Sequence, residues 1–186
     1  MSNKLFSFLV LVWFSSLALA APEKLPDFTL YEASYILFHH FNEEHQVSVW
    51  QHIPFPSKKE QKDFWGAETG LVSAVFFSPF VEDGKNKYFL LTKTVPVGEP
   101  FECHACLPLL SAVIFSEKNH RWVVESKNLF LMYAGEYSAS PKVKLVDLPG
   151  HRHGLLLTFT HYGSGEERYE NIMVSAANHS VHYDRL

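Results

Sequence analysis

The sequence has few cysteines and no excess of basic charge, and these two shortages exclude several classes of protein. Two cysteines occur among 186 residues, so a scaffold held by several disulfides is excluded and a hydrophobic core must hold the fold. Lysine and arginine number 16 against 20 aspartates and glutamates, which gives a formal net charge of −4. Nucleic-acid binding requires a basic surface that displaces counterions. We therefore expect no nucleic-acid partner.

Familiar catalytic signatures are also missing from the sequence. It contains no G-x-S-x-G elbow, no P-loop, no dinucleotide fingerprint and no H-E-x-x-H motif. The stretch 163–165 (Gly-Ser-Gly) lacks the spacing of the elbow and is typical of a turn. The sequence therefore favours a protein that acts by binding over an enzyme.

Long apolar runs are scarce, and the one that stands out lies at the start of the chain. Lys4 is followed by an apolar run, 5–14, and then by small residues that end at Ala18-Leu19-Ala20. This order is that of a secretory signal peptide with cleavage before Ala21. We expect residues 1–20 to be a signal peptide and residues 21–186 to form a single β-rich domain. The expected location is secreted or periplasmic, without membrane insertion after cleavage.

Short runs of branched and aromatic residues fill the rest of the sequence. Several of them alternate apolar with polar residues, which is typical of half-buried strands, and turn-forming residues separate them. The predicted strands are 28–38, 47–53, 71–78, 87–95, 109–116, 121–125, 129–133, 143–147, 155–162, 168–175 and 180–183. Many short strands at this spacing predict an all-β fold, either an antiparallel β-sandwich or a partly open barrel.

One short helix is predicted near 57–65. Ser57 and Glu60 have the spacing of a capping box, and the run ends at Trp65 before Gly66. A helix of this length would plug one end of the sheet or connect two strands. Trp65 is a candidate binding residue, because an exposed aromatic side chain can anchor a partner.

Cys103 and Cys106 are the two cysteines, with His104 between them. In an extended strand three residues span about 10 Å, beyond the roughly 7 Å limit for the Cα atoms of a disulfide. Pro100 and Pro108 flank the pair and favour a turn, which would let the sulfurs bond. In an exported protein we expect a local structural disulfide. The alternative is a thiol–disulfide oxidoreductase that uses Cys103 and Cys106, since a neighbouring histidine can lower the pKa of a thiol.

Histidines offer a second alternative. His151 and His153 are two residues apart, so on an extended backbone they would share one face and could hold one metal ion. His161 on the next predicted strand and His104 in the cysteine turn are further candidate ligands. Imidazole suits zinc and copper, so this reading is a metal-binding periplasmic protein. The simpler expectation is that these histidines make ordinary hydrogen bonds and that no cofactor is bound.

The sequence thus favours an exported, soluble, non-catalytic envelope or extracellular binding module. Its partner would be a protein or a small ligand. Such a module would display an exposed apolar or aromatic patch and would lack a deep polar cleft. The metal-binding and thiol–disulfide readings remain as alternatives.

Overall fold

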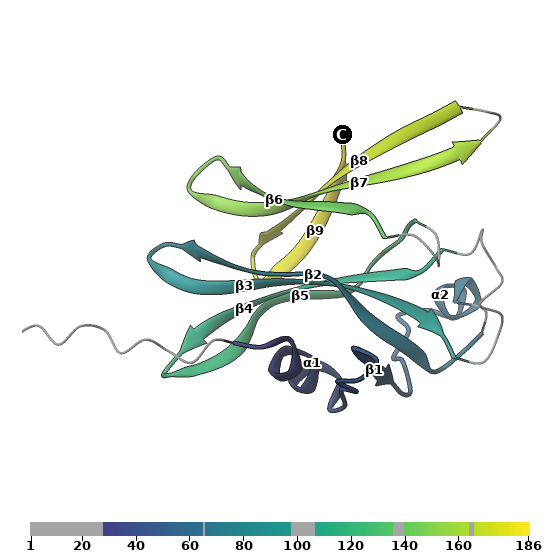
Figure 1. Ribbon diagram of the computed structural model, residues 1–186, viewed down its shortest axis with the longest axis horizontal. Helices are drawn as coiled ribbons and strands as arrows, with labels where there is room; N and C mark the ends of the chain where they lie inside the picture. Colours follow the sequence, from purple (N-terminus) through teal and green to yellow (C-terminus); the bar gives the residue numbers. More distant parts are fainter. Residues whose placement is uncertain (1–27, 65, 98–106, 136–139, 164–165) are drawn as a thin grey trace, which may run out of the picture.

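The computed structural model describes residues 28–64, 66–97, 107–135, 140–163 and 166–186, and within them the chain is mostly β-strand (Figure 1). The described part contains two short helices and nine strands. In chain order the elements are α1 (Leu30–Phe38), β1 (Val47–Trp50), α2 (Lys58–Asp63), β2 (Gly70–Glu82), β3 (Lys85–Pro96), β4 (Leu109–Lys118), β5 (Arg121–Tyr133), β6 (Lys142–Leu148), β7 (Arg152–Gly163), β8 (Glu166–Ala177) and β9 (Ser180–Arg185). The predicted all-β class is confirmed at this coarse level.

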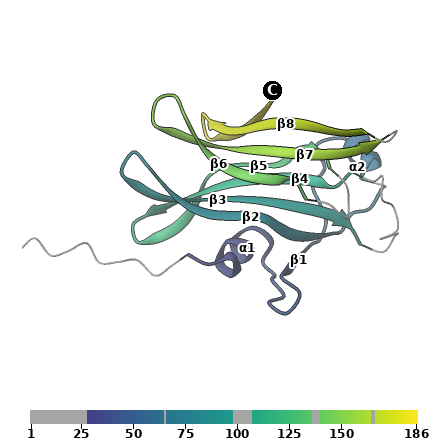
Figure 2. The ribbon, with the colours of Figure 1, turned by 45° about the horizontal axis from the view of Figure 1, so that its top comes forward.

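The nine strands make one continuous curled sheet in the order β1-β2-β3-β4-β5-β9-β8-β7-β6. Strands β1 to β5 form an antiparallel meander, which together with α1 and α2 we call the first half. Strands β6 to β9 form a second antiparallel meander, the second half. The halves join where β5 and β9 pair in parallel through Lys127 and Ser180. The curl places the second half over one face of the first, as a half-barrel (Figure 1 and Figure 2).

The inner faces of the two halves share one hydrophobic core. Alternate residues of each strand point into it, as the two-residue period of a strand dictates. Its buried members are Phe80, Phe89, Leu91, Leu110, Ala112, Ile114, Leu131, Met132, Leu155, Leu157, Phe159, Ile172, Val174 and Val181. Because this core draws on both halves, neither half buries its inner face alone.

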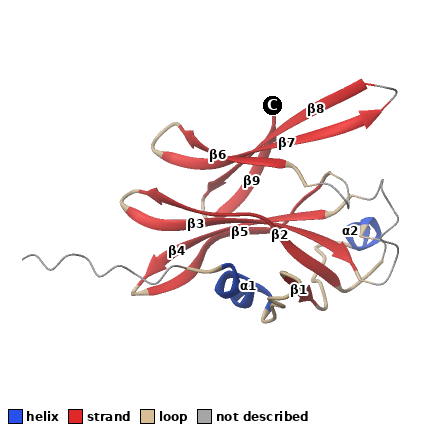
Figure 3. Cartoon of the chain, viewed as in Figure 1, coloured by secondary structure: helices blue, strands red, loops and turns tan. Residues whose placement is uncertain are grey.

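The outer face of the first half is also covered, by α1 and the segment around β1 (Figure 3). Phe28 and Ala33 pack against Leu90, Val113 and Phe115, which point away from the shared core. Strand β4 is therefore buried on both faces along 109–116. The one core cluster of the described residues that includes second-half strands contains no residue of α1 or α2, and Asn171 of β8 is exposed.

Helix α1 replaces the strand predicted at 28–38, and that prediction is wrong. Thr29 caps the helix: its side chain accepts a hydrogen bond from the backbone N–H of Glu32, and Glu32 accepts one from the backbone N–H of Thr29. This capping box satisfies backbone donors that the first turn leaves free. His39 ends the helix in a left-handed conformation, with φ at 56°. The apolar residues of the segment thus face the sheet from a helix instead of joining it.

The other predicted elements agree better with the structure. The predicted helix near 57–65 is present as α2 at Lys58–Asp63, capped by Ser57. The two predicted strands 121–125 and 129–133 are one strand, β5, whose register against β4 shifts at two irregularities. Neither helix in the described part is long and apolar enough to cross a membrane. The proposed signal peptide at 1–20 lies outside the described residues.

Four hairpin turns gather at one end of the half-barrel, which we call the turn end (Figure 1). Each contains two consecutive residues in the left-handed region, where glycine, asparagine, aspartate and histidine are enriched. The pairs are Asp83 and Gly84, Asn119 and His120, Gly150 and His151, and Asn178 and His179. Turns of this hand match the twist of the strands and fix their register. The residues next to these turns are consequently held at defined positions.

Candidate functional site

A pocket of about 310 Å³ opens at the turn end, between the first and second halves. Glu82 precedes the β2–β3 turn, Arg152 and His153 follow the β6–β7 turn, and Asn178 and His179 form the β8–β9 turn. The remaining lining residues are Ile114, Glu125, Ser126, Ala176 and Ala177. Side chains from five strands and one turn therefore converge on this pocket.

A cluster of charged side chains adjoins the pocket on the inner face of the first half. Lys87 of β3 is 5% exposed and is the one charged residue among those buried in the described part of the chain. Its Nζ lies 2.6 Å from Oε2 of Glu82 and 2.7 Å from Oε1 of Glu125. The glutamate side chains are 16% and 30% exposed, respectively. Two carboxylates share one ammonium, so the cluster carries one excess negative charge.

The environment stabilises the charged form of both Lys87 and Glu125. Burial alone would lower the pKa of Lys87, but hydrogen bonds and charges from Glu125 and Glu82 outweigh burial and raise that pKa above 10.5. Burial alone would raise the pKa of Glu125. Hydrogen bonds from Lys87 and Ser116, with the charges of Lys87 and Lys85, outweigh it and lower that pKa below 4.5. Lys87 and Glu125 are consequently both ionised at neutral pH.

His153 connects the second half to this cluster. Its backbone N–H donates to Oε1 of Glu82 at 3.0 Å, so Glu82 accepts one hydrogen bond at each carboxylate oxygen. The His153 ring packs against Phe80, with 5.1 Å between ring centroids, and its Nε2 lies 3.2 Å from Oδ1 of Asp147. Its Nδ1 is buried, makes no hydrogen bond, and lies 3.9 Å from Oε1 of Glu82. Glu82 therefore has a structural role, whereas Glu125 is the more exposed carboxylate at the pocket.

The structure separates the histidines that the sequence grouped. His151 and His153 line a neighbouring pocket of about 470 Å³ with Asp83 and Asp147. His151 lies in the turn with φ at 57°, so the shared face of an extended backbone does not apply to it. His161 lies eight residues farther along β7 than His153, where its Nε2 is 3.4 Å from Oε2 of Glu170.

The described residues contain no group of three or more histidine, cysteine, aspartate or glutamate side chains placed to hold a metal ion. His104, Cys103, Cys106 and Trp65 lie outside the described residues. The predicted disulfide and the Trp65 binding role therefore stay predictions, as do the metal-binding and thiol–disulfide alternatives. Residues 109–116, after the cysteine pair, do form the predicted strand.

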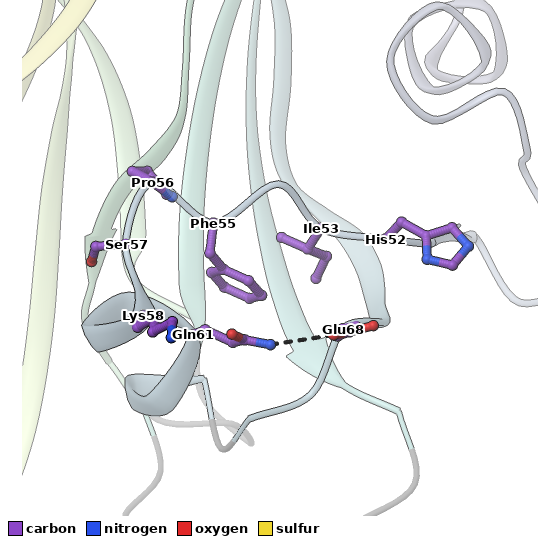
Figure 4. A pocket seen from close by; sticks show the side chains of 8 residues that line it. All are labelled: His52, Ile53, Phe55, Pro56, Ser57, Lys58, Gln61 and Glu68. Atoms are coloured by element: carbon purple, nitrogen blue, oxygen red, sulfur yellow. Dashed lines mark hydrogen bonds between the residues drawn. The ribbon is translucent and has the colours of Figure 1, made fainter.

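A third pocket, of about 490 Å³, lies beside α2 (Figure 4). His52, Ile53 and Phe55 from the segment after β1 line one part of it, and Lys58 and Gln61 of α2 line another. Glu68 completes the lining, and the Gln61 amide donates to its Oε1 at 3.4 Å. This pocket contains no buried charge cluster, and its ion-forming groups are exposed.

An exposed aromatic patch is present on α1, as expected for a binding module. Tyr31 and Tyr35 stack with ring centroids 6.1 Å apart, and both are largely exposed, as is Ile36. The turn-end pocket is small, and polar and apolar side chains line it, so the expectation that a deep polar cleft is lacking stays a prediction. Trp50 is buried in the core, and Trp122 stacks on Phe28 at 4.7 Å.

Sequence reasoning missed Glu82, Lys87 and Glu125. A signal for Lys87 is present in its own strand, because Lys87, Phe89 and Leu91 alternate and therefore face the same way. A lysine on the apolar face of a strand is rarely buried without a partner. His153 is the one residue of the predicted metal site that lines the turn-end pocket.

No family model, curated protein or solved structure matches the chain. Its function is accordingly inferred from the geometry of the site.

Proposed function

We propose that this chain is an exported binding module that takes a small polar ligand into the turn-end pocket. The observation that carries the proposal is the Glu82–Lys87–Glu125 cluster, which is buried beside that pocket. Removing charges from water is costly, and well-packed apolar side chains would often serve stability as well or better. Charged groups in shifted environments next to a cavity are typical of functional sites. A role in recognition accounts for both the charge and its position.

Binding suits the geometry better than acid–base catalysis does. Lys87 bridges both carboxylates at hydrogen-bond distance, and the low pKa of Glu125 keeps it ionised. A general acid or base near neutral pH needs a carboxylate whose pKa is raised instead. The site is thus arranged to present fixed charges.

For the fold we propose the partly open barrel over the sandwich. Support comes from the β5–β9 pairing, which continues one sheet through both halves. A nuclear Overhauser contact between the strands at Lys127 and Ser180 is expected in solution. If these strands show no contact, the two halves are separate sheets and the sandwich holds.

Export is the part of the proposal that a cell-based measurement addresses. Expression of the full chain with its leader is expected to give a protein that begins at Ala21, by N-terminal sequencing. A protein found with its first residues intact in the cytoplasmic fraction would contradict export.

Ligand binding can be tested by nuclear magnetic resonance titration of the exported protein. The probes are succinate, putrescine, L-leucine, glucose, zinc chloride and copper chloride. At least one organic probe is expected to shift the amide resonances of Ser126, Ala177 and His179, which line the pocket. Shifts confined to His151 and His153 with zinc or copper would support the metal-binding alternative instead.

A blocked pocket provides the matched control. Ala177 lines the pocket and is exposed, so Ala177→Trp fills the space and is expected to abolish the shifts. Ala74 of β2 is exposed away from the pocket, and Ala74→Trp is expected to leave them unchanged. Equal shifts in both variants would overturn the proposal.

A further inference from the structure

We propose that the turn-end pocket binds small α-amino acids as zwitterions, with the ammonium group at Glu125 and the carboxylate at Arg152. This inference rests on the proposed function, because it names the ligand class of the same pocket. It is carried by the separation of charge between the inner part of the pocket and its rim.

The inner part of the pocket requires a cation. Glu82 and Glu125 share the single charge of Lys87 and both line the pocket, and Glu125 is the more exposed of the two carboxylates. Glu82 already accepts from Nζ of Lys87 and from the backbone N–H of His153. Glu125 already accepts from Lys87 and Ser116, and a ligand ammonium group at its exposed side would balance the second carboxylate charge of the cluster. Lys85 also acts on Glu125, but its side chain is exposed and water screens it.

The rim of the pocket offers a guanidinium group to an anion. Arg152 is exposed, and its Nε donates to the carbonyl oxygen of Pro149 at 3.3 Å. A guanidinium group has five N–H donors and pairs with carboxylates through two parallel hydrogen bonds. Asn178 and His179 stand at the same rim and add further polar groups. A ligand carboxylate can therefore pair with Arg152 at the rim while the ligand ammonium pairs with Glu125 inside.

The size and walls of the pocket narrow the ligand class. A volume of about 310 Å³ lies at the lower end of ligand pockets, which run from roughly 300 to 1,000 Å³. Ile114, Ala176 and Ala177 add apolar surface to the lining. A small molecule that carries an ammonium group, a carboxylate and a short aliphatic side chain on one carbon fits this lining.

Three forms of one amino acid test the charge pattern. L-Leucine carries both charges, L-leucinamide keeps the ammonium alone, and N-acetyl-L-leucine keeps the carboxylate alone. Calorimetric titration of the exported protein at pH 7 is expected to show leucine binding at least tenfold more tightly than leucinamide. Binding of N-acetyl-leucine is expected to be weaker by at least a hundredfold. If N-acetyl-leucine binds as well as leucine, or leucine does not bind, the inference is overturned.

Substitutions assign each end of the ligand to its residue. Arg152→Ala is expected to reduce the affinity for leucine to that for leucinamide and to leave leucinamide unchanged. Arg121, exposed at the start of β5, supplies the control, because Arg121→Ala should alter neither ligand. An unchanged ratio of the two affinities in Arg152→Ala would contradict the assignment of the carboxylate.

Glu125→Gln is expected to abolish the binding of both leucine and leucinamide, whereas Glu44→Gln, at an exposed site, preserves both. Circular dichroism monitors folding of the variant, and the Arg152 comparison decides the question by itself if Glu125→Gln unfolds. Retained affinity in folded Glu125→Gln would overturn the inference.

The outcome for the proposed function is separate. If leucine fails but succinate or putrescine shifts the pocket resonances, the ligand class is wrong and the binding site stands. If no organic probe shifts them, both proposals fail.

Discussion

Strand β4 of the first half and strand β8 of the second half are buried to different extents, although both lie inside the same sheet. Residues 109–116 of β4 are all buried, whereas Ile172 and Val174 of β8 are buried between exposed Asn171 and half-buried Met173. The cause is α1 with its neighbouring segment, which covers the outer face of the first half. A strand alternates apolar and polar residues only where one face meets water, so β4 is mostly apolar on both faces, with Ser111 and Ser116 as the polar residues of 109–116.

The two halves also differ in buried charge, because the buried Lys87 lies on β3 of the first half. Replacing Lys87 with alanine leaves Glu82 and Glu125 close together without their cation. The free energy of unfolding is expected to fall by about 3–5 kcal/mol. Lys144 of β6 is exposed, and Lys144→Ala should change the free energy of unfolding by less than about 0.5 kcal/mol. Urea unfolding followed by tryptophan fluorescence measures both, and similar losses would contradict the structural role of the cluster.

Two leucines on the outer faces test the coverage itself. Leu90 of β3 is fully buried under α1, whereas Leu156 of β7 is half-buried on the outer face of the second half. Leu90→Ala is expected to lower the free energy of unfolding by about 2–5 kcal/mol, since it leaves a cavity. Leu156→Ala should cost at most about 1 kcal/mol, because water already reaches that side chain. Equal costs by urea unfolding would mean that the two outer faces are covered alike.

The pH dependence of Glu125 distinguishes buried from exposed ion pairs. Its folded pKa is lowered, so its contribution to stability is present above its ordinary value of 4.5 and is lost as pH falls through the folded value. The pKa of Lys87 is raised, so its contribution is present below 10.5 and is lost as pH rises through the folded value. At pH 7, Glu125→Gln is expected to cost about 1.5–3 kcal/mol, and the difference from wild type should shrink below pH 4.5.

Glu170 of the second half provides the control for this measurement. It pairs with Arg185, whose side chain is 73% exposed, so Glu170→Gln should cost less than about 1 kcal/mol. Urea unfolding at a series of pH values gives both profiles. If the stability difference between wild type and Glu125→Gln stays constant down to pH 3, the cluster does not lower the pKa of this carboxylate.

The smallest expected effect concerns the cap of α1. Thr29→Ala removes the hydroxyl that accepts from the backbone N–H of Glu32 and should cost about 1 kcal/mol. Hydrogen exchange is expected to become faster at amides of β3 and β4 under α1, with β7 and β8 unaffected. Faster exchange in the second half as well would mean that α1 supports the whole sheet.

The sequence predicts the strands well where turn-forming residues bound them, and this holds for the fully buried 109–116 as well as for strands with a polar face. Residues 143–147, 155–162 and 168–175 lie within β6, β7 and β8, because alternation and turn residues are both visible there. The segment 28–38 fails because its aromatic and branched residues suit a strand as well as a buried helix face. Its capping box, Thr29 to Glu32, was the local signal that favoured a helix.

The candidate site could be predicted only in part. His153 was identified as a candidate ligand, and it lines the turn-end pocket. Lys87 and Glu125 are 38 residues apart, and their pairing depends on the register of β3, β4 and β5. Such a contact is set by the tertiary arrangement of strands, which the local residue pattern does not encode.

The junction of β5 and β9 through Lys127 and Ser180 bears on how the chain matures. The first half is synthesised before the second, and its inner face then exposes Phe80, Phe89 and Leu91 to water. Exposed apolar strands are prone to aggregate until the second half packs against them. Chaperones that shield this surface during synthesis are therefore expected to raise the yield of folded protein, and truncation of the second half should make the remainder insoluble.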